Sequence, residues 1–182
     1  MYLKCKDLTR RLQPTLVPRA AEAQLGLILI GGGAMDRSFV VENTKERERL
    51  CSIVARLTDD QLSFPMENGW TIAVALAHLA FWDQRSLILM RKWKLTGVAP
   101  SPIDIDVTND SLLPLWLALA PRAAAKLAVA SAEAIDRELE ESPSEFISAI
   151  ENLGERFRLY RSEHRKLHLD DIEEFLRNKD AT

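Results

Sequence analysis

The chain of 182 residues contains only two cysteines, Cys5 and Cys51, and they form no CxxC motif. With no sign of secretion, the sequence predicts two free thiols in a reducing cytoplasm, and neither a disulfide scaffold nor a cysteine-based metal site. An excess of basic residues is also missing, because 24 Lys and Arg stand against 27 Asp and Glu. A net charge of −3 argues against a general nucleic-acid-binding protein, although a small local basic patch is compatible with it.

Long apolar runs are absent as well. No uninterrupted run approaches the ~18 residues that a membrane-spanning helix needs, and LGLILI at residues 25–30 is too short. We therefore expect a cytoplasmic protein that does not enter the membrane. With 47% apolar and 28% charged residues, the composition is that of an ordinary globular domain. We find no Ser-His-Asp set, phosphate-binding glycine loop or pair of catalytic carboxylates.

Residues 1–34 differ from the rest of the chain. They carry five Lys or Arg against two acids, lack a helical period and end in three glycines and an alanine before Met35. We interpret them as an arm, either a disordered extension or a mis-assigned start, and residues 35–182 as the domain. An organelle-targeting arm is disfavoured by Asp7, Glu22 and the scarcity of serine. A chain that starts at Met35 should therefore melt within a few degrees of the full chain.

Apolar spacing from residue 43 onward predicts an all-α protein, a bundle of four main helices with no sheet. The four helices are expected near residues 44–57, 71–94, 121–140 and 155–177.

Helix boundaries follow from capping signals. Asn43 with Glu46 predicts the first start, Thr71 predicts the second, and SPSE at residues 142–145 predicts a further one. Residues 99–110 are interpreted as a crossover loop that leads into a short helix from about Asn109.

All three histidines of the chain fall on predicted apolar helix faces. His164 and His168 are one turn apart in the last helix, and His78 lies among apolar neighbours in the second. Helical spacing places the pair in one stripe, which contains Phe157, Tyr160, His164, Leu167, His168, Asp171, Ile172 and Phe175. An HxxxH pair is common on helix surfaces without a metal. Burial favours a shared metal ion instead, because each unsatisfied buried ring nitrogen costs about 1–3 kcal/mol.

Two segments resemble the DinB-like proteins, a family related to mycothiol-dependent maleylpyruvate isomerase. NGWTIAVALAHLAFWDQR at residues 68–85 resembles the family's tryptophan and HLxxWD block, and RSEHRKLHLDDIEEFL at residues 161–176 resembles its closing HRxxHLxxIE helix. The resemblance extends over about residues 42–178. It implies an up-down-down-up four-helix bundle with zinc or nickel held by His78, His164 and His168.

Some members of that family are mycothiol- or bacillithiol-dependent transferases or isomerases, whereas many have no assigned reaction. Three neutral ligands would leave one position of the metal open for a low-molecular-weight thiol, which would be bound as a thiolate and attack an electrophile. The alternatives are a non-catalytic metal-binding stress or interaction protein, which could form a homodimer, and a metal-dependent hydrolase.

Five further residues are candidates for roles around the metal, and each has a plainer alternative. Asp171 could orient an imidazole, or it could be a solvated acid. Arg85 and Arg161 could bind a substrate carboxylate, or they could form surface salt bridges. Trp82 and Tyr160 could line a pocket, or they could be ordinary core residues.

Overall fold

The computed structural model describes residues 36–66 and 69–180. Within these ranges all regular structure is helical, apart from one isolated bridge between Pro65 and Thr71. The elements are α1 (Ser38–Arg56), α2 (Asp59–Leu62), α3 (Ile72–Thr96), α4 (Ile105–Leu117), α5 (Pro121–Glu140), α6 (Ser144–Asn152), the 3₁₀ helix η1 (Arg156–Arg158) and α7 (Arg161–Asp180). The prediction of an all-α fold is confirmed. The predicted arm, residues 1–34, and Cys5 lie outside the described residues.

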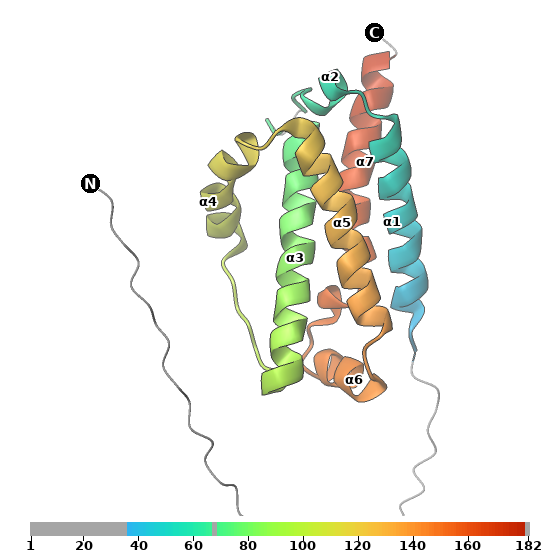
Figure 1. The fold of residues 1–182 in the computed structure, drawn as a ribbon, viewed down its shortest axis with the longest axis vertical. Coiled ribbons are helices and arrows are strands. Elements are labelled where there is room, and N and C mark those ends of the chain that lie inside the picture. The colour runs from blue at the N-terminus through green and yellow to red at the C-terminus, as the bar shows by residue number, and fades with distance from the viewer. Residues whose placement is uncertain (1–35, 67–68, 181–182) are drawn as a thin grey trace, which may run out of the picture. The chain divides into compact units, whose positions relative to one another are not determined.

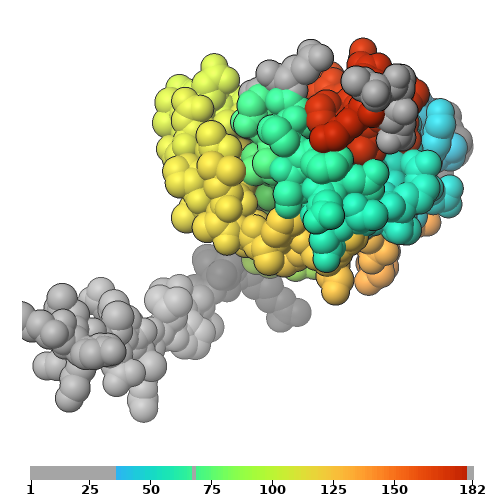
Figure 2. All heavy atoms as spheres, turned by 90° about the horizontal axis from the view of Figure 1, so that it is seen from above, coloured from blue at the N-terminus to red at the C-terminus, as the bar shows by residue number. Residues whose placement is uncertain are grey.

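Four long helices pack along one another (Figure 1). Helix α1 contacts α5 and α7, and α3 contacts the same two helices. In Figure 1, α1 and α7 run upward, whereas α3 and α5 run downward. Helix α4 contacts α3 from outside this group. Seen from above in Figure 2, the teal segment around α2 covers one end of the bundle between yellow α4 and red α7.

Helix α3 is the central helix of the core. Every residue from Ile72 to Ala80 is buried, and Thr71 caps the helix by accepting a hydrogen bond from the Val74 backbone N–H, as predicted. By length and hydropathy α3 could cross a membrane, which the search for uninterrupted apolar runs did not reveal. However, 72% of the apolar 18-residue stretch of α3 is buried inside the protein. Its hydropathy is therefore explained by its place in the core.

The predicted start of the first helix is wrong. Helix α1 begins at Ser38, and Asn43 lies within it, buried. The Asn43 amide donates to the Leu159 carbonyl and accepts from the Ser162 backbone N–H, each at 2.8 Å. The side chain that resembled a cap therefore serves as a tertiary contact between α1 and the start of α7.

The starts of α6 (Ser144) and α7 (Arg161) also differ from the predicted helix starts. The Ser142 hydroxyl donates to the Glu138 carbonyl and so completes α5, which leaves Pro143 as the residue that precedes α6. The last helix begins at Arg161 and not near residue 155, because the positive φ of Gly154 and the turn of η1 interrupt the chain.

The predicted crossover loop is helical in its second half. Asp104 accepts a hydrogen bond from the Val107 backbone N–H and thereby starts α4 at Ile105, four residues before the predicted start at Asn109. An aspartate cap was present in the sequence, but the alternation of Ile and Asp around it concealed the helix. This early start places Asn109 within α4 and turns it toward α3.

The buried guanidinium of Arg165 joins all four long helices. Extending from α7 and 0% exposed, it donates to Asp83 of α3 at 3.0 Å and to Asp136 of α5 at 2.8 Å. A third bond, at 3.3 Å, goes to the backbone carbonyl of Asn43 in α1. Arg161 donates to the other oxygen of Asp83 at 2.8 Å. Two buried carboxylates thus balance two buried guanidinium groups.

Replacing Arg165 with methionine should therefore destabilise the protein strongly. Without Arg165, Arg161 is the one buried guanidinium group left among the described residues to balance the two buried carboxylates of Asp83 and Asp136, and we expect the free energy of unfolding to fall by about 3–5 kcal/mol. Urea denaturation followed by circular dichroism measures this. The exposed neighbour Lys166, changed to methionine, is the matched control and should lose less than about 1 kcal/mol. An Arg165→Met variant as stable as this control would contradict the assignment.

Candidate metal centre

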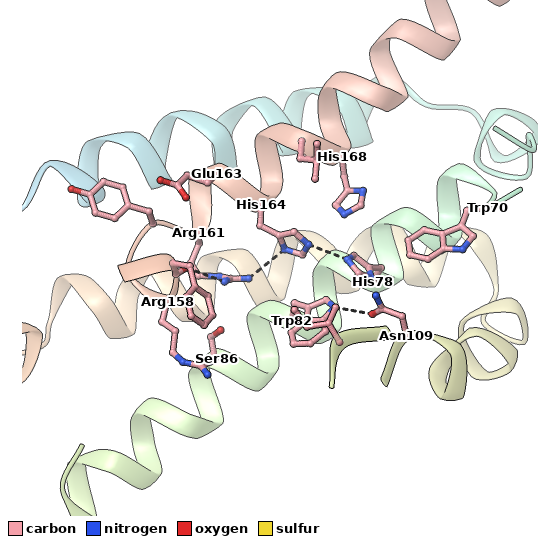
Figure 3. A pocket seen from close by; sticks show the side chains of 14 residues that line it. Trp70, His78, Trp82, Ser86, Asn109, Arg158, Arg161, Glu163, His164 and His168 are labelled. Carbon is pink, nitrogen blue, oxygen red and sulfur yellow. Dashed lines mark hydrogen bonds between the residues drawn. The ribbon is translucent and has the colours of Figure 1, made fainter. Parts of the chain in front are cut away.

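The three histidines converge between α3 and α7 (Figure 3). His78 comes from the buried part of α3, and His164 and His168 lie one turn apart on α7. The ring centroids form a nearly equilateral triangle, with His78 5.0 Å from His164 and 4.7 Å from His168, and 5.0 Å between His164 and His168. One ligand nitrogen from each ring lies within 4.8 Å of the others. The predicted convergence of the three rings is therefore observed, and the cluster could hold a metal ion.

All three imidazoles are neutral at pH 7. Burial lowers the pKa of His78 to about 3, with His168 and Arg161 adding to the effect. Burial also lowers the pKa of His164 to about 2, helped by the nearby positive charge of Arg161. The pKa of His168 is lowered by burial too, although Asp171 opposes the shift. Neutral imidazoles keep the nitrogen lone pairs that a metal ion requires.

The chemistry of this donor set fits a divalent cation. The Nε2 atoms of His78 and His164 lie 2.9 Å apart, somewhat closer than the roughly 3.3 Å expected for two nitrogens at tetrahedral zinc. The Nδ1 atom of His78 is buried and has no hydrogen-bond partner among the described residues. Within the described ranges, the hydrogen bonds of the histidine triad thus leave at least one ring nitrogen unsatisfied. Imidazole nitrogen suits zinc and nickel among the divalent metals.

Arg161 lies beside the triad and is not a surface residue. Its side chain is 5% exposed and pairs with Asp83 at 2.8 Å, so the alternative of a surface salt bridge is wrong. A second nitrogen of the guanidinium lies 3.4 Å from the Nδ1 atom of His164. Figure 3 marks this contact with a dashed line. The buried ionic network around Arg165 therefore extends to a ring of the candidate metal centre.

Asp171 does not orient an imidazole through a hydrogen bond in the described part of the chain. It is exposed on α7 and affects His168 through its charge, by raising the pKa of the ring. This position agrees with the solvated alternative. The reason is the direction of the His168 ring, which turns toward His78, whereas Asp171 lies one turn further along the helix on its outer face.

A cavity of about 410 Å³ adjoins the triad. Trp82 and Tyr160 line it, as the pocket hypothesis anticipated, and Trp70 stacks 6.2 Å from His168. The Trp82 indole donates to the Asn109 side-chain oxygen at 3.2 Å, which ties α3 to α4 across the cavity wall. The remaining residues of the wall are Ser86, Ile105, Phe157, Arg158, Arg161, Glu163 and Leu167. Aromatic and aliphatic side chains thus enclose most of the space beside the histidines.

The predicted stripe on the last helix is correct for the histidines but not for all of its members. Phe157 precedes α7 and is 51% exposed, and Leu167 is 59% exposed. Both line the mouth of the cavity and not the core. The predicted stripe does not include Arg165 and Leu169, which are both fully buried. Arg165 was missed because arginine is usually a surface residue.

For Arg85, too, the alternative of a surface salt bridge is wrong. The described residues offer it no ion pair, and its Nη2 atom donates instead to the carbonyl and hydroxyl of Ser101, at 3.4 and 3.2 Å. It lines a second hollow on the outer side of α3, together with Ser101. Arg158, which no sequence pattern singled out, is buried nearby and contacts the same carbonyl at 3.3 Å.

The lowered pKa values predict a pH dependence for the metal-free protein. In the unfolded chain a histidine titrates near ~6.5, so protonation favours the unfolded state below that pH. The free energy of unfolding should fall between about pH 6.5 and pH 3, by up to ~1.4 kcal/mol per pH unit for each histidine. Urea denaturation of chelator-treated protein across this range measures the slope. His78→Phe should flatten the slope, and NMR titration of His78 and His164 near the ordinary pKa would contradict the prediction.

Comparison with known proteins agrees with this geometry. A family model described as the DinB superfamily matches residues 42–175, which is more than half of the chain and includes all three histidines, Asp83 and Arg165. Searches of curated proteins and of solved structures gave no significant match. On the evidence of the family model, the chain belongs to the DinB superfamily.

Proposed function

We propose that this protein is a metal-dependent enzyme that activates a low-molecular-weight thiol for an S-transferase or isomerase reaction. His78, His164 and His168 would hold the metal, zinc or nickel, on the scaffold of an up-down-down-up four-helix bundle. The observation that carries the proposal is the convergence of three neutral imidazoles on the wall of a cavity of about 410 Å³. Membership of the DinB superfamily and the helix directions in Figure 1 support it.

The chemistry follows from the ligand set. When bound by three neutral side chains, a divalent cation supplies Lewis acidity and lowers the pKa of a thiol or water beside it. Trp70 and Trp82 line the cavity beside the histidines and present apolar faces to a substrate. Arg161, locked by Asp83, lies beside the ring of His164 on the side away from His78, and its positive charge helps to keep that imidazole neutral. The protein therefore contributes three neutral ligands beside a largely apolar wall.

The cavity favours catalysis over a purely structural metal. Structural zinc sites are closed by four protein ligands, whereas the described residues supply three beside an open space. Among the residues that the structure describes, no cysteine thiol lines the cavity. Cys51 lies on α1, does not line the cavity, and has its pKa raised by burial. An external thiol is the nucleophile that the site lacks.

Titration of thiols into the cobalt-substituted protein tests the proposal. Mycothiol, bacillithiol or glutathione should produce an intense sulfur-to-metal charge-transfer band, because the open position of the ion is exposed to the cavity. His78→Ala should abolish the band. Asp171→Asn, a change at an exposed position on the same helix as two ligands, is the matched control and should retain it.

The alternative functions predict a different result. A metal-binding stress or interaction protein, or a metal-dependent hydrolase, has no need to bind a thiol at the metal. If the cobalt spectrum of wild-type protein is the same with and without all three thiols, the transferase and isomerase proposal is wrong.

A further inference from the structure

Arg85 and Arg158 form a positively charged site beside Ser101, in the segment that connects α3 to α4. Arg85 follows His78 by two turns of α3, which corresponds to about 10 Å along the helix axis. Its Nη1 atom is buried and has no hydrogen-bond partner among the described residues. A buried guanidinium nitrogen without an acceptor is costly, so this atom points to a missing partner.

Arg158 brings a second cation to the same place. Its side chain is 3% exposed, and its Nη2 atom donates to the Ser101 carbonyl, the same oxygen that accepts from Arg85. Glu155 pairs with Arg158 and is the carboxylate whose charge acts on both guanidinium groups. Two arginines therefore share one acid, which leaves one positive charge uncompensated. Burial lowers the pKa of both guanidinium groups, and the positive charge of Arg161 adds to the effect on each.

The two arginines stand between two hollows. Arg158 lines the cavity that contains the histidines, whereas Arg85 and Ser101 line a hollow of about 400 Å³ on the outer side of α3. Figure 3 shows the Arg158 side chain beside Ser86, at the end of the cavity away from His168. A ligand that reaches from the histidines along the apolar wall would thus arrive at a cationic end.

We propose that Arg85 and Arg158 bind the carboxylate of an elongated organic anion whose other end reaches the histidine triad. This inference rests on the proposed function and names the class of its substrate. The body of the molecule is apolar, since Trp82, Ile105 and Phe157 line its path, and roughly 10 Å separate its two ends. Guanidinium groups recognise a carboxylate through paired, charge-assisted hydrogen bonds, which would satisfy the Nη1 atom of Arg85.

Octanoate is a thiol-free probe of suitable length, and its binding to the metal-free full-length protein can be measured by calorimetry. We expect octanoate to bind roughly tenfold or more tightly than octanamide, because only the carboxylate gains charge-assisted hydrogen bonds. Arg85→Gln should lose most of this preference, and Arg85→Lys should retain part of it. Arg91→Gln is the matched control, since Arg91 is an exposed arginine on α3 that pairs with Glu138.

Equal affinity for octanoate and octanamide, or equal octanoate affinity in wild type and Arg85→Gln, would overturn the inference. In that case water satisfies the Nη1 atom of Arg85. A second titration separates this failure from failure of the proposed function. If cobalt-loaded protein shows no charge-transfer band with 8-mercaptooctanoate or with any of the three low-molecular-weight thiols, the thiol chemistry is wrong, while the carboxylate site stands on the octanoate result alone.

Discussion

The neutralisation of one buried charge constrains the whole bundle. Arg165 has no access to water, and burying an unpaired guanidinium group would cost several kcal/mol. It is compensated only when α3 presents Asp83, α5 presents Asp136 and α1 presents the Asn43 carbonyl at the same level. Apolar packing alone tolerates small sliding of helices, whereas hydrogen bonds to a planar guanidinium group do not. The ionic network therefore fixes the relative register of the four long helices.

That register also sets the geometry of the candidate metal centre. Asp83 lies five residues after His78 on α3, and Arg161 and Arg165 flank His164 on α7. The contacts that join Asp83 to both arginines consequently hold His164 at a fixed height relative to His78. The two sets of residues use different faces of α7. Arg165 and Leu169 turn into the core, and the histidines turn toward the cavity, so the metal site lies at the edge of the core where a substrate has access.

Much of this arrangement was readable from the sequence. Helical spacing was sufficient to identify the all-α fold and to place the three histidines on apolar helix faces. The cost of burying unsatisfied imidazoles favoured a shared ion, and the resemblance to the DinB-like proteins implied that His78, His164 and His168 are one ligand set. The helix boundaries were harder to predict from the sequence. Asn43 and Ser142 are good capping residues, but each finds its partner elsewhere in the fold, and local sequence does not reveal such a choice. Arg165 was missed for the same reason, because its burial depends on ion pairs with Asp83 and Asp136, which lie far away in the sequence.

The central claim is that the three histidines form a metal site on this scaffold. Zinc content of protein purified without a histidine tag, measured after dialysis, tests it most directly. The wild type should retain about one equivalent, and the His164→Ala/His168→Ala variant should retain almost none, because two of three ligands are lost. Glu163→Gln, which changes a neighbouring residue at the cavity wall, should retain the wild-type amount. Equal zinc content in the wild type and the double variant, or no retained metal in the wild type, would contradict the account.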